Sequence, residues 1–136
     1  MKKVVLDTNV IIAAFTSRGL ANSVFELCLG KFEIILSEYI INEVSDKLTG
    51  KLKVPPEIVN EIINFLRDSC TISGYALLEE NVCRDIKDDN ILALASSSKS
   101  KHIITGDKDL LVLNKFEKIH IVNPRQLWQK IKDGKL

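Results

Sequence analysis

The chain has 136 residues and a formal net charge of +1, with 46% hydrophobic and 27% charged residues. These values are typical of one soluble domain with its own core, so we expect a single domain over residues 1–136. No apolar run reaches the roughly 18 residues of a membrane span, and the three scattered cysteines form no CxxC pair. We therefore expect no membrane partner, no disulfide framework and no zinc site.

The N-terminal segment MKKVVLDTNV is basic and then apolar, but Asp7 interrupts its apolar part too early for a signal peptide. We therefore expect a cytoplasmic protein.

Short apolar runs alternate with amphipathic stretches along the chain. Strands are predicted at KVVLD, FEIILS, CTIS, HIITGD and KIHIV, which are residues 3–7, 32–37, 70–73, 102–107 and 118–122. Helices are predicted at 21–30 with Gly30 at the end, 37–50, 54–69 and 90–99, then a helical turn at 108–113 and a last helix at 123–132. This alternation predicts an α/β domain whose central sheet of four to five strands is mainly parallel and flanked by helices.

The helix at 37–50 has the clearest local pattern. Ser37 is a plausible N-cap and Gly50 a plausible end. Ile40, Val44 and Leu48 recur at a spacing of four residues and form the apolar stripe that would face the core.

Acidic residues follow two of the predicted strands. Asp7 comes directly after KVVL, and Asp107 lies two residues beyond HIIT. The loop that enters the alanine-rich helix adds three more acids, Asp85, Asp88 and Asp89. Because ligands of an open parallel sheet bind outside the carboxyl ends of its strands, these acids are expected at one functional edge.

Several carboxylates held together repel one another by roughly 4 kcal/mol per pair at about 4 Å and an effective dielectric near 20. Protonation or a divalent cation would have to compensate. Hard oxygen ligands favour Mg²⁺ or Mn²⁺, and such a cation attracts phosphates and activates water. The acids therefore indicate a metal-dependent phosphoryl chemistry.

Each acid also has an ordinary structural explanation. Asp7 could cap a helix that begins at Thr8, and one of Asp88 and Asp89 could cap the alanine-rich helix. Glu43 lies four residues before Lys47, which is a favourable helix pair.

Asp107 and Asp109 could be ordinary turn residues. The metal reading therefore depends on the shared location of the acids rather than on any one of them.

Basic residues concentrate in the last third of the chain. Residues 97–136 hold nine Lys and Arg against four Asp and Glu, which gives +5, so residues 1–96 carry −4. This region could contact phosphates or could simply be a solvated face. His102 and His120 lie within strands and lack a suitably spaced acid or nucleophile, so we interpret both as structural.

Four segments together resemble PIN domains, metal-dependent nucleases that include VapC-like toxins. They are VVLDTNVIIAAF, SEYIINEVSDKL, RDIKDDNILALA and IITGDKDLL, which occur in the order of that family's motifs. The ending IHIVNPRQLW is similar to the subgroup of toxin components of toxin–antitoxin systems.

The resemblance implies an assignment of the acids. The catalytic metal ligands would be Asp7, Glu43, Asp88 and Asp107, with Asp88 preferred to Asp89 because it stands at the family's distance from Ile91, Ala93 and Ala95. Auxiliary positions would be Thr8, Asn9, Asp85, Asp89, Thr105 and Asp109. The basic residue that usually follows the first motif has no clear match, and Arg18 is a candidate by proximity alone.

The resemblance also implies a function: hydrolysis of RNA phosphodiester bonds with one or two Mg²⁺ or Mn²⁺ ions. The chain would be the toxin of a type II toxin–antitoxin module, with an antitoxin partner and a homodimeric state. The helix PPEIVNEIINFLRDS at 55–69 and its neighbour are the candidate interface. The alternatives are a stand-alone PIN nuclease in RNA processing and a PIN fold that binds RNA without cleaving it.

Two unrelated classes fit less well. A phosphatase of the haloacid dehalogenase type would need an acid where Asn9 stands. A receiver-like module would need adjacent acids before the first loop and a lysine after the last strand, where the chain has LDTN and VNPR.

Overall fold

The computed structural model describes all residues from 1 to 136. Its six strands are β1 Lys3–Leu6, β2 Glu33–Leu36, β3 Thr71–Ile72, β4 His102–Ile104, β5 Lys115–Phe116 and β6 Ile119–Val122. Its helices are α1 Thr8–Thr16, α2 Leu20–Lys31, α3 Glu38–Thr49, α4 Pro56–Ser69, α5 Ile86–Ser98, α6 Lys108–Leu111 and α7 Pro124–Lys132.

The strands form one sheet in the order β3-β2-β1-β4-β6-β5. All neighbours are parallel except the short β5–β6 hairpin, so the predicted α/β architecture with a mainly parallel sheet is confirmed. Val5 pairs with Ile35 on one side and with Ile103 on the other, which makes β1 a central strand. Asp7, the next residue after β1, therefore leaves the middle of the sheet.

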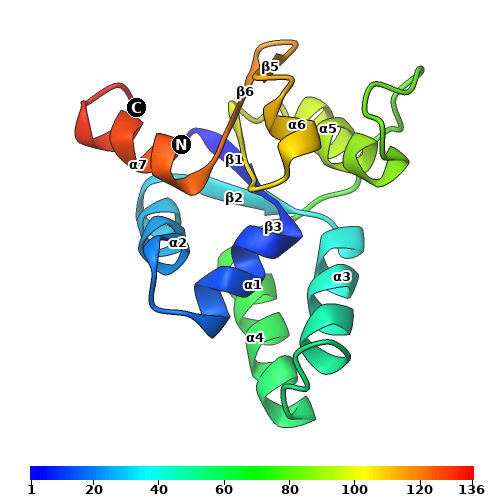
Figure 1. The fold of residues 1–136 in the computed structure, drawn as a ribbon, viewed down its shortest axis with the longest axis vertical. Coiled ribbons are helices and arrows are strands. Elements are labelled where there is room, and N and C mark those ends of the chain that lie inside the picture. The colour runs from blue at the N-terminus through cyan, green and yellow to red at the C-terminus, as the bar shows by residue number, and fades with distance from the viewer.

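Helices cover both faces of the sheet. Figure 1 shows α1 to α4 on one side and α5 on the other, with α3 and α4 projecting together away from the strands. α5 packs against β1, β2 and β4, and its residues 91–95 are all buried. Because both faces are covered, β1 is apolar without alternation, as expected for a central parallel strand.

Three local predictions were wrong. α2 continues one residue past Gly30 and ends at Lys31, with Phe32 as its C-cap before β2 begins. α5 begins at Ile86 rather than at Asn90, and Asp85 is its N-cap, so neither Asp88 nor Asp89 caps it. The sheet also gains β5, a two-residue strand too short to produce a periodic pattern.

No single helix is long and apolar enough to cross a membrane. α1 and α2 together have the length and composition of a broken span, with a bend of 108° between them. Their apolar side chains Val10, Ile11, Val24 and Phe25 belong to the buried core.

The predicted N-cap of α3, Ser37, can be tested by mutation. The Ser37 side chain accepts a hydrogen bond from the backbone N–H of Ile40 at 3.2 Å, in a buried setting. We predict that Ser37→Ala lowers the free energy of unfolding by about 1 kcal/mol, because that donor loses its partner. Urea denaturation measures the change, and Ser45→Ala within the same helix is the control. Equal stability of the two variants would contradict the assigned cap.

Candidate metal centre

Two neighbouring strands deliver the first pair of acids. Asp7 follows β1 and caps α1, accepting the Thr8 N–H at 2.7 Å, while Asp107 follows β4 and caps α6, accepting the Asp109 N–H at 2.9 Å. Thr105, which is fully buried, joins them: its hydroxyl donates to Asp7 Oδ2 at 2.7 Å and accepts the Asp107 N–H at 3.0 Å. The two carboxylates are thus set by backbone geometry and one shared threonine.

Two helices bring the other acids to the same place. Glu43 comes from α3, which packs against α1, and it accepts a hydrogen bond from the Thr8 hydroxyl at 2.8 Å. Asp88 comes from the first turn of α5. All four acids line one pocket of about 230 Å³. Its full lining is Asp7, Thr8, Asn9, Glu43, Lys47, Asp85, Lys87, Asp88, Ile91 and Asp107.

Asp88 is buried in this pocket next to other carboxylates, which makes its ionised form unfavourable. Only 8% of the residue is exposed, and its Oδ2 atom is buried without any hydrogen-bond partner. Burial, together with the carboxylates of Asp107, Asp7 and Asp85, raises the pKa of Asp88 to about 7.

Burial also raises the pKa of Asp7. The hydrogen bonds from Thr105 and Thr8 oppose that effect, while the charges of Asp107 and Glu43 add to it. The metal-free pocket therefore favours bound protons at two of its acids.

The donor set fits a divalent cation. It consists of carboxylate oxygens, which are hard ligands, and one of them is the unpaired Oδ2 of Asp88. One oxygen from each of Asp88, Asp107 and Asp109 can be chosen so that all three lie within 4.8 Å of one another. Asp109, which was predicted as an auxiliary residue, therefore lies close enough to Asp88 and Asp107 to share a cation with them.

Asp89 has a different task from Asp88. It is also buried, but its carboxylate accepts the backbone N–H groups of Val82, at 3.2 Å, and Cys83, at 2.8 Å. Asp89 thereby fixes the loop before α5 and does not line the pocket.

The other two predicted acids have partners of their own. Asp85 lines the pocket and caps α5 through the Lys87 N–H, and Asp109 forms an ion pair with Arg84 at 3.3 Å.

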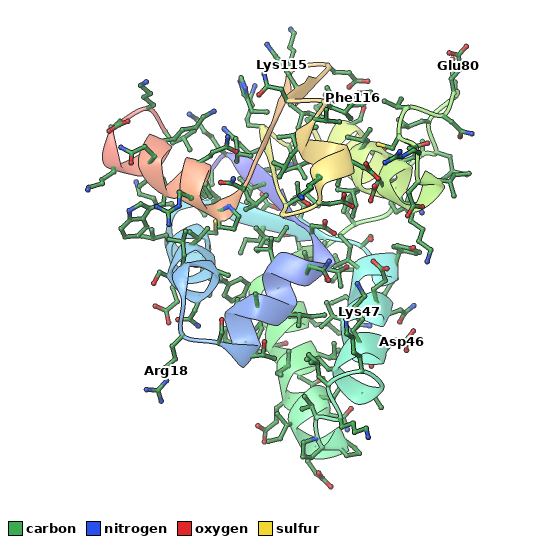
Figure 2. The ribbon with its side chains drawn as sticks, viewed as in Figure 1. Arg18, Asp46, Lys47, Glu80, Lys115 and Phe116 are labelled. Atoms are coloured by element: carbon green, nitrogen blue, oxygen red, sulfur yellow. The ribbon has the colours of Figure 1, made fainter.

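Lys47 lines the pocket, a role that the sequence analysis did not predict for it. It forms no ion pair with Glu43; instead its ammonium group donates to Asn9 Oδ1 at 3.0 Å, across from α3 to α1. Figure 2 shows Lys47 on the side of α3 that faces α1, whereas Arg18 points away from the molecule at the far end of α1. The position of Lys47 one turn after Glu43 was the available signal.

Lys87 also lines the pocket and was not predicted. Its place immediately before Asp88 in DIKDD could have indicated it.

The raised pKa of Asp88 gives a pH-dependent stability. Because the folded protein holds this proton between 3.8 and about 7, the metal-free protein should lose stability as the pH rises through that window. We predict that Asp88→Asn, which cannot ionise, is more stable than the wild type by at least about 1.4 kcal/mol at about pH 8 without metal. The two proteins should be nearly equal at about pH 4.

Asp89→Asn is the matched control for that measurement, since it makes the same change one residue later. It should lose about 1–2 kcal/mol instead, because two backbone donors lose a charged acceptor. Urea unfolding in EDTA at both pH values measures these differences. A destabilised Asp88→Asn at about pH 8 would refute the strained carboxylate.

The family model described as PIN domain matches residues 3–109. Among curated proteins, the uncharacterized protein MJ1680 of Methanocaldococcus jannaschii is 35% identical over 129 residues, covering 89% of this chain and 83% of that protein.

Two solved structures share the fold. VapBC2 from Rickettsia felis, bound to a DNA fragment from its promoter, has a TM-score of 0.65 at 12% identity and covers 89% of this chain and 98% of its own. Mycobacterium tuberculosis VapC20, a toxin that cleaves the sarcin–ricin loop, has a TM-score of 0.60 at 9% identity and covers 86% of this chain and 98% of its own. With a family match over most of its length, the chain belongs to the PIN domain family.

Proposed function

We propose that this protein is an endoribonuclease that hydrolyses RNA phosphodiester bonds with Mg²⁺ or Mn²⁺. The observation that carries the proposal is the buried carboxylate of Asp88, which has no partner among the protein's own donors and faces three other acids. A metal-dependent nuclease uses such a set, because a bound divalent cation lowers the pKa of water and stabilises charge on the phosphoryl oxygens.

The ligands would be Asp7, Glu43, Asp88 and Asp107. Thr105 and Thr8 hold two of them through hydroxyl hydrogen bonds of 2.7 and 2.8 Å, so these carboxylates are oriented before any ion arrives. The proximity of Asp109 to Asp88 and Asp107 makes it a further candidate ligand.

Lys47 would hold the substrate. Its ammonium group lines the same pocket as the acids and is fixed by Asn9, so it can meet a phosphate oxygen beside the scissile bond. Lys47 then takes the role for which Arg18 had been considered, since Arg18 lies outside the pocket.

The histidines take no part in this chemistry. His102 and His120 pair in register at the start of β4 and in β6, at the amino ends of the strands. Neither lines the acidic pocket, so proton transfer during hydrolysis falls to water and the carboxylates.

The biological role that fits best is the toxin of a type II toxin–antitoxin module acting in the cytoplasm. This rests on the family and on the likeness to VapBC2 and VapC20. The partner would be an antitoxin protein, and the chain would form a homodimer. α4 is a candidate contact, because Ile58 and Phe65 are 44% and 43% exposed on it.

Cleavage tests the metal mechanism. Purified protein should cleave single-stranded RNA with Mg²⁺ or Mn²⁺, and Asp88→Asn should lower the rate at least about 100-fold, because a ligand charge is lost. Gel analysis of labelled RNA, with EDTA as the second control, measures the rate. Cleavage that persists in EDTA would remove the proposal. RNA binding without cleavage in either metal would favour the non-catalytic alternative.

Lys47→Met separates substrate contact from metal binding. We predict that kcat/KM falls about 10- to 100-fold, since one charge-assisted contact to a phosphate is worth about 1.5–3 kcal/mol. Mn²⁺ affinity, measured by calorimetry, should not weaken, because the change removes a positive charge. Lys51→Met, just beyond α3 and outside the pocket, should leave both values unchanged. Wild-type kinetics in Lys47→Met would refute the contact.

A further inference from the structure

The end of the sheet opposite the acidic pocket carries a group of lysines. They stand where neighbouring strands begin, and we call them the amino-edge lysines: Lys2, Lys3, Lys99, Lys101 and Lys118. Backbone hydrogen bonds place their strands side by side, since the Lys101 N–H donates to Lys3 O and the His120 N–H donates to Lys101 O. Figure 1 shows the start of the chain and α7 close together on this side, away from α3.

These lysines line two hollows that share a wall. One, of about 550 Å³, is lined by Met1, Lys2, Lys3, Lys99 and Lys101. The other, of about 380 Å³, includes Lys99, Lys101 and Lys118 together with the hydroxyl residues Ser96 and Ser100 and one acid, Glu117. Because Lys99 and Lys101 belong to both, the hollows form one concave basic surface.

No acid neutralises this surface by direct contact. The molecule has two ion pairs, Arg67–Glu38 and Arg84–Asp109, and neither includes an amino-edge lysine. Glu33, opposite Lys3, and Glu117 lie near these lysines, but their carboxylates accept from the Thr71 and Ser96 hydroxyls and form no ion pair with a lysine. Five lysines against these two acids leave the surface positive. The ammonium groups are therefore available to an external anion.

Two histidines at this end of the sheet also lie near positive charges. Burial, together with the charges of Lys130, His120 and Lys2, lowers the pKa of His102 to about 4. The pKa of His120 is also lowered, by burial and by Lys130 and Lys115. His102 is buried with both ring nitrogens unpaired.

We propose that the amino-edge lysines bind the phosphate backbone of single-stranded RNA at a second site, remote from the acidic pocket. Lysines without ion-pair partners that line a concave surface match a flexible polyanion, which can follow the hollow and place successive phosphates against them. The choice of RNA among polyanions rests on the proposed function, whereas the anion site itself does not.

The geometry implies a length requirement. β1 separates Lys3 from Asp7 by four residues, or roughly 13 Å along the strand, and the path over the surface is longer. An RNA of a few nucleotides can fill the acidic pocket alone, while a longer strand can reach both ends of the sheet.

Direct binding tests the site without catalysis. The variant is Lys99→Gln with Lys101→Gln, and the control is Lys51→Gln with Lys53→Gln, which removes the same charge elsewhere. The pairs also match in backbone, because Lys99 and Lys53 have φ of 59° and 52°. Anisotropy with a labelled 20-nucleotide RNA in EDTA should show about tenfold weaker binding for the first pair. The slope of log binding constant against log salt concentration should also be less steep by about 1.4 for this variant, because each of two lost phosphate contacts contributes about 0.7.

Several results would overturn the proposal. They are equal affinities of the two pairs, tighter binding of a 20-base-pair DNA duplex than of the RNA, and dependence on Lys99 and Lys101 only for vesicles containing phosphatidylserine. A cleavage assay tests the proposal separately. The variant Lys99→Gln with Lys101→Gln should cleave the 20-nucleotide RNA more slowly than the wild type, but a five-nucleotide RNA at the same rate. If the wild type cleaves neither RNA, the proposed function fails while the binding result still decides the anion site.

Discussion

The repulsion among carboxylates at the carboxyl edge of the sheet is the constraint on which the site depends. A folded chain gains nothing by burying Asp88 beside Asp107 and Asp7, because each ionised neighbour makes the next charge more costly. The raised pKa of Asp88 and its unpaired Oδ2 are two expressions of that cost. A divalent cation would neutralise this repulsion, and the same carboxylates would then serve as its ligands.

The rest of the fold makes this arrangement unavoidable. Asp7 and Asp107 end adjacent parallel strands, so they cannot separate without unpairing β1 from β4. Thr105 then ties one to the other, and Thr8 ties Glu43 to α1. The clustered carboxylates thus destabilise the fold at one edge of the sheet, and the apolar core of β1, β2, β4 and α5 offsets that cost.

Much of this could be predicted from the sequence, because apolar strands followed by acids in a parallel sheet converge on one edge. The gathering of Asp7, Glu43, Asp88 and Asp107 at one pocket follows from that rule and from the family resemblance together. The α5 boundary could not be predicted in the same way, because Asp85, Asp88 and Asp89 are all of a residue type that caps helices, and only the hydrogen bond from the Lys87 N–H selects Asp85.

Side-chain partners were the least predictable feature. Lys47 is in the position of an ordinary helix pair with Glu43, and only the packing of α3 on α1 turns it toward Asn9. Likewise, Asp88 and Asp89 are adjacent in sequence, but the loop that folds back through Val82 and Cys83 gives them opposite roles. Contacts between distant segments decide both cases, and a linear pattern does not contain them.

The parallel sheet also gives the molecule two unlike ends. Acids gather at the carboxyl ends of its strands, and lysines gather at the amino ends, so a net charge of +1 conceals a strong separation of charge. In keeping with this polarity, the last third of the chain supplies Asp107 to the acidic pocket but none of its lysines or arginines lines it.

Calorimetric titration of Mn²⁺ into metal-free protein at about pH 7, in two buffers of different protonation enthalpy, tests the central claim most directly. The account predicts saturable binding whose heat depends on the buffer, because the ion displaces the proton that Asp88 partly holds at this pH. No binding at millimolar Mn²⁺, or binding that releases no protons, would contradict it.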